Sequence, residues 1–218
     1  MEHGGLHCGD VPQLLFNGPP NASTTVVLAH GAGAGMDTPF MEYFAQGLAE
    51  GGLRVVRFEF PYMAQRRLAG PKRPPDRADV LRQNWLEVIG QFPGQRLVIG
   101  GKSLGGRIAS VIADEAQMAG LVCLGYPFHP SGKPSHTRIE HLRTIKTPTL
   151  ILQGTRDPLG SRNEVAGYPL ATAVRLHWLE DGEHSFKPRK ASGRTEMENW
   201  QEAVVEMLGF IGGLQNPT

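Results

Sequence analysis

The sequence predicts an α/β fold in which helices cover both faces of a mostly parallel central sheet. Segments rich in β-branched and aliphatic residues alternate with segments whose apolar residues recur every three to four positions. This alternation is typical of parallel strands joined by helical crossovers. The chain has 218 residues, 40% of them hydrophobic, and no linker rich in Pro, Gly or Ser. We therefore expect a single domain over residues 1–218.

Seven segments are expected to form strands. Residues 12–16 are predicted to be an edge strand, and six short apolar runs give the other strands. These runs are 24–29, 54–58, 96–100, 121–124, 149–152 and 174–179.

Four helices are expected between and after these strands. The first follows the start signals Asp37, Thr38 and Pro39 and ends before Gly51. The second begins at about Asp76, and the third follows the 96–100 strand. The predicted buried stripe of the third helix is Leu104, Ile108, Val111 and Ile112, and the closing helix carries Met197, Trp200, Val204 and Leu208.

The connection between the strand at 121–124 and the next strand bears on access to a site. It runs only from 126 to 148, with one short helical segment at 138–142. A large helical cap cannot fit there. We therefore expect no large cap domain and an open site bordered by Tyr126, Phe128 and His129.

The segment Gly101-Lys102-Ser103-Leu104-Gly105 has the pattern G-x-S-x-G between a strand and a helix. Such a tight turn strains the backbone of the central residue and needs small neighbours, and it presents the Ser103 hydroxyl as a nucleophile. The backbone N–H of Leu104 is one expected oxyanion donor. The glycine-rich loop after the 24–29 strand supplies the other from Ala32, with Gly31 and Gly33 beside the substrate.

A serine hydroxyl needs a base, and the base needs an orienting carboxylate. His184 and Asp157 each follow the end of a predicted strand, so that all three side chains fall at the carboxyl edge of the sheet. Asp181 is the rival acid. Because it shares a short loop with His184, its side chain would have to fold back on its neighbour, whereas Asp157 approaches from an adjacent strand. These residues predict a serine hydrolase that cleaves an ester or thioester through an acyl-enzyme at Ser103; the alternative is a non-catalytic binding protein that retains the triad.

Two nucleotide-binding motifs are incomplete in this sequence. A phosphate-binding loop ending at Ser103 requires glycine where Arg96 stands, and a dinucleotide fingerprint through Gly31 requires Gly or Ala where Met36 stands. We expect no cofactor.

The motifs at 30–37, 101–107, 125–130 and 177–184 carry a resemblance to a known family. The chain resembles the α/β-hydrolase superfamily over nearly its whole length. Within it, the motifs are similar to the branch that includes a testis-expressed protein and a subunit of the nonspecific-lethal chromatin complex, with dienelactone-hydrolase-like enzymes as relatives. The resemblance implies the α/β-hydrolase fold and a catalytic site at Ser103, Asp157 and His184. Because the chromatin-complex subunit serves as a binding component, the resemblance also implies that a member of this branch can bind without catalysis.

Charge and composition limit the partners. A formal net charge of +1 argues against a nucleic-acid partner, and no leader-like segment or long apolar run indicates a membrane. Two basic segments near the expected site predict an anionic small-molecule substrate. Their residues are Arg66, Arg67, Lys72, Arg73, Arg77, Lys187, Arg189, Lys190 and Arg194.

The two cysteines predict no disulfide framework and fit a reduced cytoplasmic compartment. Cys123 lies in a predicted buried strand and is expected to pack there. His3, His7 and Cys8 form a poor metal site, so no metal is expected. The sequence leaves the oligomeric state open.

Overall fold

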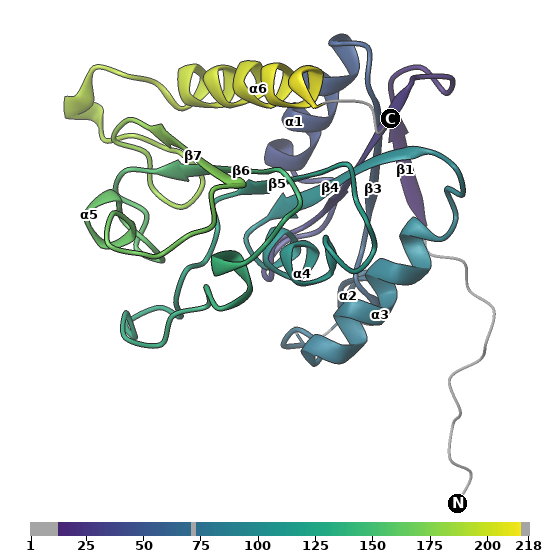
Figure 1. Ribbon diagram of the computed structural model, residues 1–218, viewed down its shortest axis with the longest axis horizontal. Helices are drawn as coiled ribbons and strands as arrows, with labels where there is room; N and C mark the ends of the chain where they lie inside the picture. The colour runs from purple at the N-terminus through teal and green to yellow at the C-terminus, as the bar shows by residue number, and fades with distance from the viewer. Residues whose placement is uncertain (1–12, 71–72, 215–218) are drawn as a thin grey trace, which may run out of the picture.

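The computed structural model describes residues 13–70 and 73–214, whose strands form one sheet in the order β1-β3-β2-β4-β5-β6-β7 (Figure 1). The strand β1 runs antiparallel to β3 at one edge, and the other neighbouring pairs are parallel. The strands are β1 (Leu14–Asn17), β2 (Thr24–Ala29), β3 (Arg54–Phe58), β4 (Arg96–Lys102), β5 (Gly120–Leu124), β6 (Thr149–Gly154) and β7 (Val174–Leu179). The predicted α/β class is confirmed, and Pro12 of the predicted edge strand lies outside the described residues.

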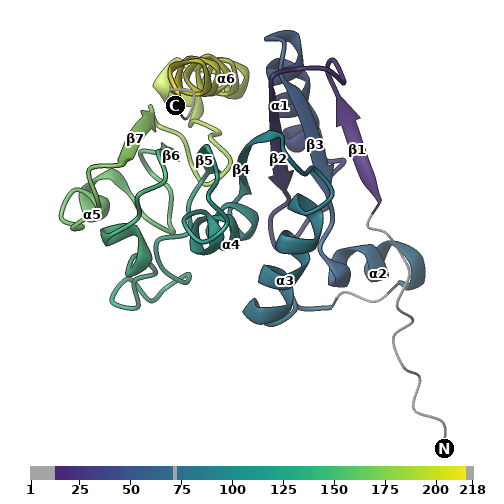
Figure 2. The same ribbon diagram turned by 45° about the vertical axis from the view of Figure 1, so that its right-hand side comes forward.

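Helices form a layer on each side of this sheet (Figures 1 and 2). The helices are α1 (Pro39–Glu50), α2 (Pro61–Ala69), α3 (Ala78–Ile89), α4 (Leu104–Ile112), α5 (Arg162–Val165) and α6 (Glu196–Gly213), with 3-10 turns at His141–Arg143 and Lys190–Ser192. One apolar cluster joins α1 and α6 to the sheet through Phe44 and Met207. A second cluster joins α3 and α4 to the opposite face through Trp85 and Ile108. Burial on both faces explains why the central strands are almost wholly apolar.

The start of α1 follows the predicted capping chemistry. Thr38 is the N-cap, and its hydroxyl accepts a hydrogen bond from the Met41 N–H at 3.4 Å. Pro39 occupies the first turn, where its missing N–H costs no helical hydrogen bond.

Two features differ from the sequence prediction. Val111 was expected in the buried stripe of α4, but 44% of its surface is exposed, and Ala109 is fully buried instead. None of the four helices expected from the sequence covers the segment containing Arg66 and Arg67, yet this segment forms α2. No local side chain caps α2; the Asp76 carboxylate accepts a hydrogen bond from the Tyr62 N–H at 2.9 Å. This helix is therefore stabilised by a residue that is distant in sequence.

The topology brings several loops to the carboxyl edge of the sheet. The loop at 30–35 follows β2, Ser103 follows β4, Asp157 follows β6, and His184 follows β7. These strands are parallel, and β2, β4, β5, β6 and β7 are consecutive in the sheet, so their carboxyl ends meet at one edge. Between β5 and β6 the chain adds only the 3-10 turn at His141–Arg143. As predicted, the described residues include no large cap over this edge.

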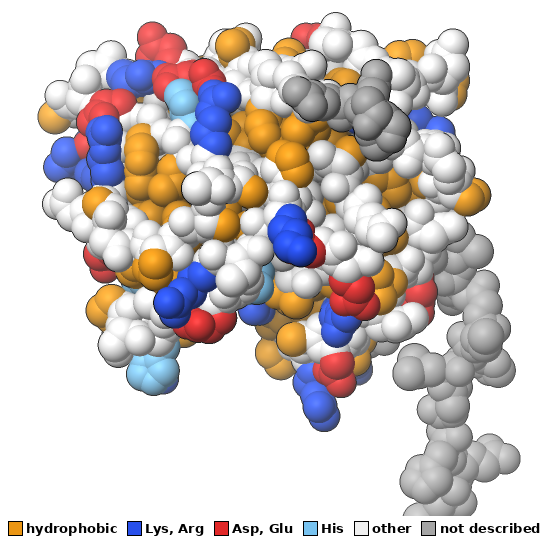
Figure 3. All heavy atoms as spheres, in the orientation of Figure 1, with side chains coloured by type: hydrophobic (Ala, Val, Ile, Leu, Met, Phe, Trp, Pro, Cys, Tyr) orange, Lys and Arg blue, Asp and Glu red, His pale blue; other side chains and the backbone are white. Residues whose placement is uncertain are grey.

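Charged side chains of both signs lie next to one another over β7 and α6, at the upper left of Figure 3. The ion pairs Arg175–Glu206 and Arg194–Glu202 account for part of this mosaic. Within the described residues, no helix combines the length and apolar composition needed to cross a bilayer.

Candidate active site

Ser103 occupies a strained turn between β4 and α4. Its φ of 48° and ψ of −110° are rare for a residue with a side chain. A Cβ atom on Gly105 would lie 2.4 Å from the Ala29 carbonyl oxygen, and one on Gly101, whose φ is +144°, would lie 2.0 Å from the same atom. The close approach of this turn to β2 therefore requires both glycines of the G-x-S-x-G motif.

The three side chains expected to act together form a hydrogen-bonded chain. The Ser103 Oγ lies 2.9 Å from His184 Nε2, and His184 Nδ1 lies 2.8 Å from Asp157 Oδ2. Because a carboxylate only accepts hydrogen bonds, His184 donates from Nδ1 and its Nε2 is left to accept the Ser103 proton. The Asp157 side chain is fully buried, whereas 22% of the His184 side chain is exposed.

Asp157 is oriented by further donors. The buried Gln153 donates from Nε2 to Oδ2 at 2.9 Å, and the Leu159 N–H donates to Oδ1 at 2.8 Å. Gln153 is fixed in turn by the Tyr126 N–H, which donates to its Oε1 at 2.7 Å. Both carboxylate oxygens therefore have partners, as a buried charge requires. Sequence analysis did not identify Gln153, whose signal was only its position four residues before Asp157.

Asp181, the rival acid, has different partners. Its carboxylate accepts hydrogen bonds from the Arg189 N–H at 2.7 Å and from Arg189 Nε at 2.9 Å, and it forms an ion pair with Arg156. The hydrogen bonds from Arg189 hold the pKa of Asp181 well below its usual range. The carboxylate that contacts His184 is therefore that of Asp157.

Lys102 is a further residue at this site to which the sequence assigned no role. Its ammonium donates a hydrogen bond to the His184 carbonyl oxygen. The Nζ atom also lies 5.0 Å from the ring centroid of Phe40 and 5.5 Å from that of Phe186, distances typical of cation–π contacts. Burial lowers the pKa of Lys102 to about 8. Lys102, which directly precedes Ser103, thus fixes the position of the His184 backbone through this hydrogen bond.

The expected oxyanion donors lie beside Ser103. Ala32 and Leu104 line the same pocket as Ser103, and among the described residues neither backbone N–H has a hydrogen-bond partner. Free N–H groups at this position are available to a carbonyl oxygen of a substrate. Gly31 also approaches the elbow, since a Cβ built on it would lie 3.8 Å from the Ser103 Cβ.

The loop that contains Ala32 is held by side chains from α2 and from its own start. Tyr62 donates to the Ala32 carbonyl at 3.1 Å, and Arg66 donates to the Gly33 carbonyl at 3.1 Å. The ring of His30 bonds on both sides: Nδ1 donates to the Gly31 carbonyl at 2.6 Å, and Nε2 accepts from the Phe60 N–H at 3.1 Å. Burial lowers the pKa of His30, which favours this neutral form.

A pocket of about 400 Å³ opens over Ser103. Most of its lining is apolar, and its polar side chains include His129, Arg107, Arg138 and Asp76. The apolar lining residues are Ala32, Pro75, Ala78, Leu81, Leu104, Pro127, Pro130 and Leu159.

Two residues expected at the border of this pocket lie elsewhere. Tyr126 and Phe128 are fully buried and belong to the apolar core, where their rings pack 4.8 Å apart between centroids. This corrects their assignment as substrate-binding residues, because the loop at 125–130 turns its aromatic side chains inward. His129 does line the pocket, although it is itself buried.

Some of the basic residues expected near the pocket form ion pairs with carboxylates of the protein. Arg67 forms ion pairs with Asp37 at 2.8 Å and with the buried Glu59 at 2.6 Å. Arg189 is paired with Asp181, and Lys72 lies outside the described residues. Neighbouring carboxylates therefore neutralise part of this positive charge, which weakens the expected field at the mouth of the pocket.

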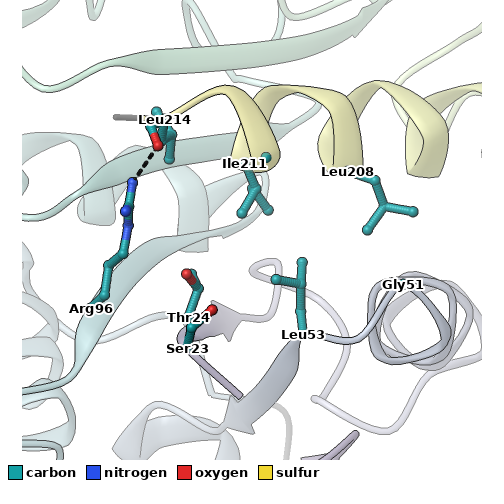
Figure 4. Close-up of a pocket in the computed structure, with 9 residues that line it drawn as sticks. Ser23, Thr24, Gly51, Leu53, Arg96, Leu208, Ile211 and Leu214 are labelled. Atoms are coloured by element: carbon teal, nitrogen blue, oxygen red, sulfur yellow. Dashed lines mark hydrogen bonds between the residues drawn. The ribbon is translucent and has the colours of Figure 1, made fainter. Parts of the chain in front are cut away.

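A second groove, of about 370 Å³, lies at the opposite edge of the sheet (Figure 4). Thr24 and Arg96, at the starts of β2 and β4, line it together with Leu208 and Ile211 of α6. Arg96 donates a hydrogen bond to the Leu214 carbonyl at 2.7 Å across it. This groove is distant from the Ser103 elbow because it lies at the other end of the same strands.

Cys123 packs in the core, as expected for its strand. Cys123 is fully buried in β5, its Sγ lies 3.5 Å from the Gly106 carbonyl oxygen, and burial raises the pKa of its thiol. His3, His7 and Cys8 lie outside the described residues. Within those residues, no group of three or more His, Cys, Asp or Glu side chains is arranged to bind a metal.

The fold and the elbow define an α/β-hydrolase, and comparison with known proteins agrees. Residues 22–212 match the family model of an alpha/beta hydrolase domain. The chain therefore belongs to the alpha/beta hydrolase family.

Solved structures of three proteins are similar to this chain. A serine hydrolase without a lid from Xanthomonas campestris is 18% identical with a TM-score of 0.66, and the match covers 94% of this chain and 90% of that one. A dienelactone hydrolase from Anabaena variabilis is 24% identical with a TM-score of 0.68, covering 92% and 93%. Est1E from Butyrivibrio proteoclasticus is 14% identical with a TM-score of 0.67, covering 91% and 94%. At these identities the likeness establishes the fold, whereas the narrower resemblance to the testis-expressed branch stays a prediction.

Proposed function

We propose that this protein is a serine hydrolase that cleaves a carboxylic ester or thioester through an acyl-enzyme at Ser103. The observation that carries the proposal is the hydrogen-bonded chain from Ser103 Oγ through His184 to Asp157, with distances of 2.9 Å and 2.8 Å. The proposal is also supported by the strained turn at Ser103, which lines an open pocket together with Ala32 and Leu104, whose backbone N–H groups have no partner among the described residues.

The proposed reaction has two halves. In the first, Ser103 Oγ bonds to the carbonyl carbon while its proton passes to His184 Nε2. The bond to the leaving group then breaks, and His184 gives the proton to the departing alcohol or thiol. In the second half, water attacks the acyl-Ser103 carbonyl and transfers a proton to His184. The bond to Oγ breaks, the acid leaves, and Oγ regains its proton.

The surrounding residues have separate roles in this scheme. Asp157 holds His184 in the tautomer that accepts at Nε2 and stabilises the imidazolium when it forms. The N–H groups of Leu104 and Ala32 bind the oxyanion, and α4 directs the positive end of its dipole toward it. Lidless serine hydrolases, dienelactone hydrolase and Est1E have similar folds, which supports a hydrolase of this kind.

The proposal is tested by labelling the purified protein with a fluorophosphonate, which phosphonylates activated serines. We expect stoichiometric labelling at Ser103 that is lost in Ser103→Ala. The matched control is Ser23→Ala, which removes an exposed hydroxyl at the opposite edge of the sheet and should label like wild type. A folded wild-type protein that remains unlabelled would favour the alternative, a binding protein that retains the triad without turnover.

A further inference from the structure

Two arginines that line the Ser103 pocket have no acidic partner. Among the described residues, the side chains of Arg107 and Arg138 form no ion pair and donate no hydrogen bond. The Nε of Arg107 is buried without an acceptor. Guanidinium groups in partly buried positions are normally paired with carboxylates or phosphates, so an anionic group of a bound molecule is a suitable partner for these two side chains.

Arginines nearby but outside the pocket behave differently. Arg67 is paired with Asp37 and Glu59, and Arg189 is paired with Asp181. Arg67 and Arg189 are therefore neutralised by carboxylates of the protein, whereas the charges of Arg107 and Arg138 face the pocket without such a partner among the described residues.

Arg107 is also well placed relative to the nucleophile. Its backbone N–H bonds to the Ser103 carbonyl at 2.9 Å, so that it lies one turn further along α4. Ser103 and Arg107 line the same pocket. An acyl group attached to Ser103 and held in that pocket would therefore lie near Arg107.

The charges that line the pocket favour an anion. Burial lowers the pKa of Arg107, and the neighbouring charge of Arg138 lowers it further. Asp76 is the acidic residue among the described lining residues, and its Oδ2 already accepts a hydrogen bond from the Tyr62 N–H. Two positive charges and one negative charge leave the lining with one net positive charge, which matches a monoanion.

We propose that Arg107 and Arg138 bind a carboxylate carried on the acyl part of the substrate. This inference rests on the proposed hydrolase function and names its substrate class: monoesters or monothioesters of dicarboxylic acids. The apolar walls would contact the hydrocarbon between the two acyl carbons. A carboxylate on the acyl part stays bound through both halves of the reaction, because the acyl group remains on Ser103 until water releases it.

The first test compares two esters of equal size. Mono-4-nitrophenyl adipate carries the acyl carboxylate, and 4-nitrophenyl 6-oxoheptanoate replaces that carboxylate with a neutral methyl ketone. We expect wild type to prefer the adipate monoester by at least about tenfold in kcat/KM, because charge-assisted hydrogen bonds from Arg have this strength. Equal values of kcat/KM for the two esters would overturn the proposal.

Variants assign the preference to residues. Arg107→Gln and Arg138→Gln should each reduce the preference about tenfold, with most of the loss in kcat/KM for the adipate monoester. The matched control is Arg143→Gln. Arg143 lies, like Arg138, in the connection between β5 and β6, and its exposed positive charge is paired with Glu140. A preference that falls equally in Arg143→Gln would mean that only the long-range field acts, which contradicts direct binding.

A binding measurement separates failure of this inference from failure of the proposed function. Calorimetric titration of monomethyl adipate into Ser103→Ala requires no catalysis. Binding that is lost in the Arg107→Gln and Arg138→Gln backgrounds supports the carboxylate site even if wild type hydrolyses no ester. Absence of binding in Ser103→Ala, or tighter binding of monobutyl phosphate than of monomethyl adipate, overturns the assignment to a carboxylate.

Discussion

Asp157 and Asp181 show how the partners of a carboxylate decide its role at this site. Asp181 shares a loop with His184, but its carboxylate is already bound by Arg189 and Arg156. Asp157 is buried, is fixed by Gln153 and Leu159, and has one remaining contact, His184 Nδ1. A carboxylate already bound by arginines has little capacity to orient an imidazole.

We therefore predict that Asp157→Asn lowers kcat by on the order of a thousandfold or more, because the amide cannot stabilise the imidazolium or fix its tautomer. Asp181→Asn should lower kcat by less than about tenfold. The measurement is steady-state hydrolysis of any ester that wild type turns over, with fluorophosphonate labelling as a second readout. Reversed magnitudes would assign the orienting role to Asp181.

On folding, the ammonium group of Lys102 moves from water into a less polar environment. Its ammonium contacts the His184 carbonyl and two aromatic rings, while Asp157 and Glu183 are the charged groups that favour its protonated form. Burial is the larger effect, and it lowers the pKa to about 8 from an ordinary value of 10.5.

This shift predicts a pH dependence of folding stability. Below pH 8 Lys102 is charged in both states, so the folded protein bears the full cost of its burial. Between about pH 8 and 10.5 the folded protein releases the proton while the unfolded chain keeps it, and stability therefore rises with pH. Urea unfolding of wild type and Lys102→Met should show wild type gaining more than about 1 kcal/mol relative to the variant across this window. A constant difference would show that Lys102 does not titrate as described.

At the scale of elements, α2 supports the loop that carries the Ala32 donor. Tyr62 and Arg66 of α2 bond to the Ala32 and Gly33 carbonyls. The hydrogen bond from Tyr62 fixes the carbonyl of Ala32, the same residue whose N–H is the oxyanion donor. The position of this donor therefore depends on a helix from another part of the chain. A hydrogen bond that fixes a backbone donor affects the transition state more than substrate binding.

Removal of this support should slow catalysis. We expect Tyr62→Phe to lower kcat about tenfold with little change in KM, since the oxyanion contact exists mainly in the transition state. Tyr43→Phe is the matched control, because its hydroxyl is exposed and bonds to Gln201 on α6. If Tyr62→Phe raised KM and left kcat unchanged, Tyr62 would act on substrate binding instead.

Sequence and structure agree where local patterns decide the outcome. The G-x-S-x-G turn, the apolar strands and the Thr38-Pro39 helix start each depend on neighbouring residues, and each could be predicted. The helix α2 could not, because its first turn is capped by Asp76 from beyond the helix. The burial of Tyr126 and Phe128 also depends on packing against distant segments, as does the use of Gln153 to hold Asp157. Residue type alone does not show these contacts.

At the scale of the whole molecule, residues 13–70 and 73–214 form no large cap over the pocket at the carboxyl edge of the sheet. The short connection between β5 and β6 contains one 3-10 turn among the described residues. No element of that size can act as a lid that opens on contact with an aggregated substrate.

The open site predicts no interfacial activation. For 4-nitrophenyl butyrate, the rate should follow a hyperbola in substrate concentration through the solubility limit, because no lid has to move before substrate enters. A stepwise rise in rate when droplets form would indicate that a segment covers the pocket in solution. The measurement is initial velocity in the presence and absence of emulsified substrate.

The central claim is that Ser103 becomes covalently acylated. The most direct measurement is intact-protein mass spectrometry after rapid acid quench of wild type mixed with excess 4-nitrophenyl ester, followed by peptide mapping. We predict an added acyl mass on the peptide that contains Ser103, together with a burst of 4-nitrophenol stoichiometric with the protein. Both signals should vanish in Ser103→Ala. Turnover without a burst or an acyl adduct at Ser103, or equal turnover by Ser103→Ala, would contradict the account.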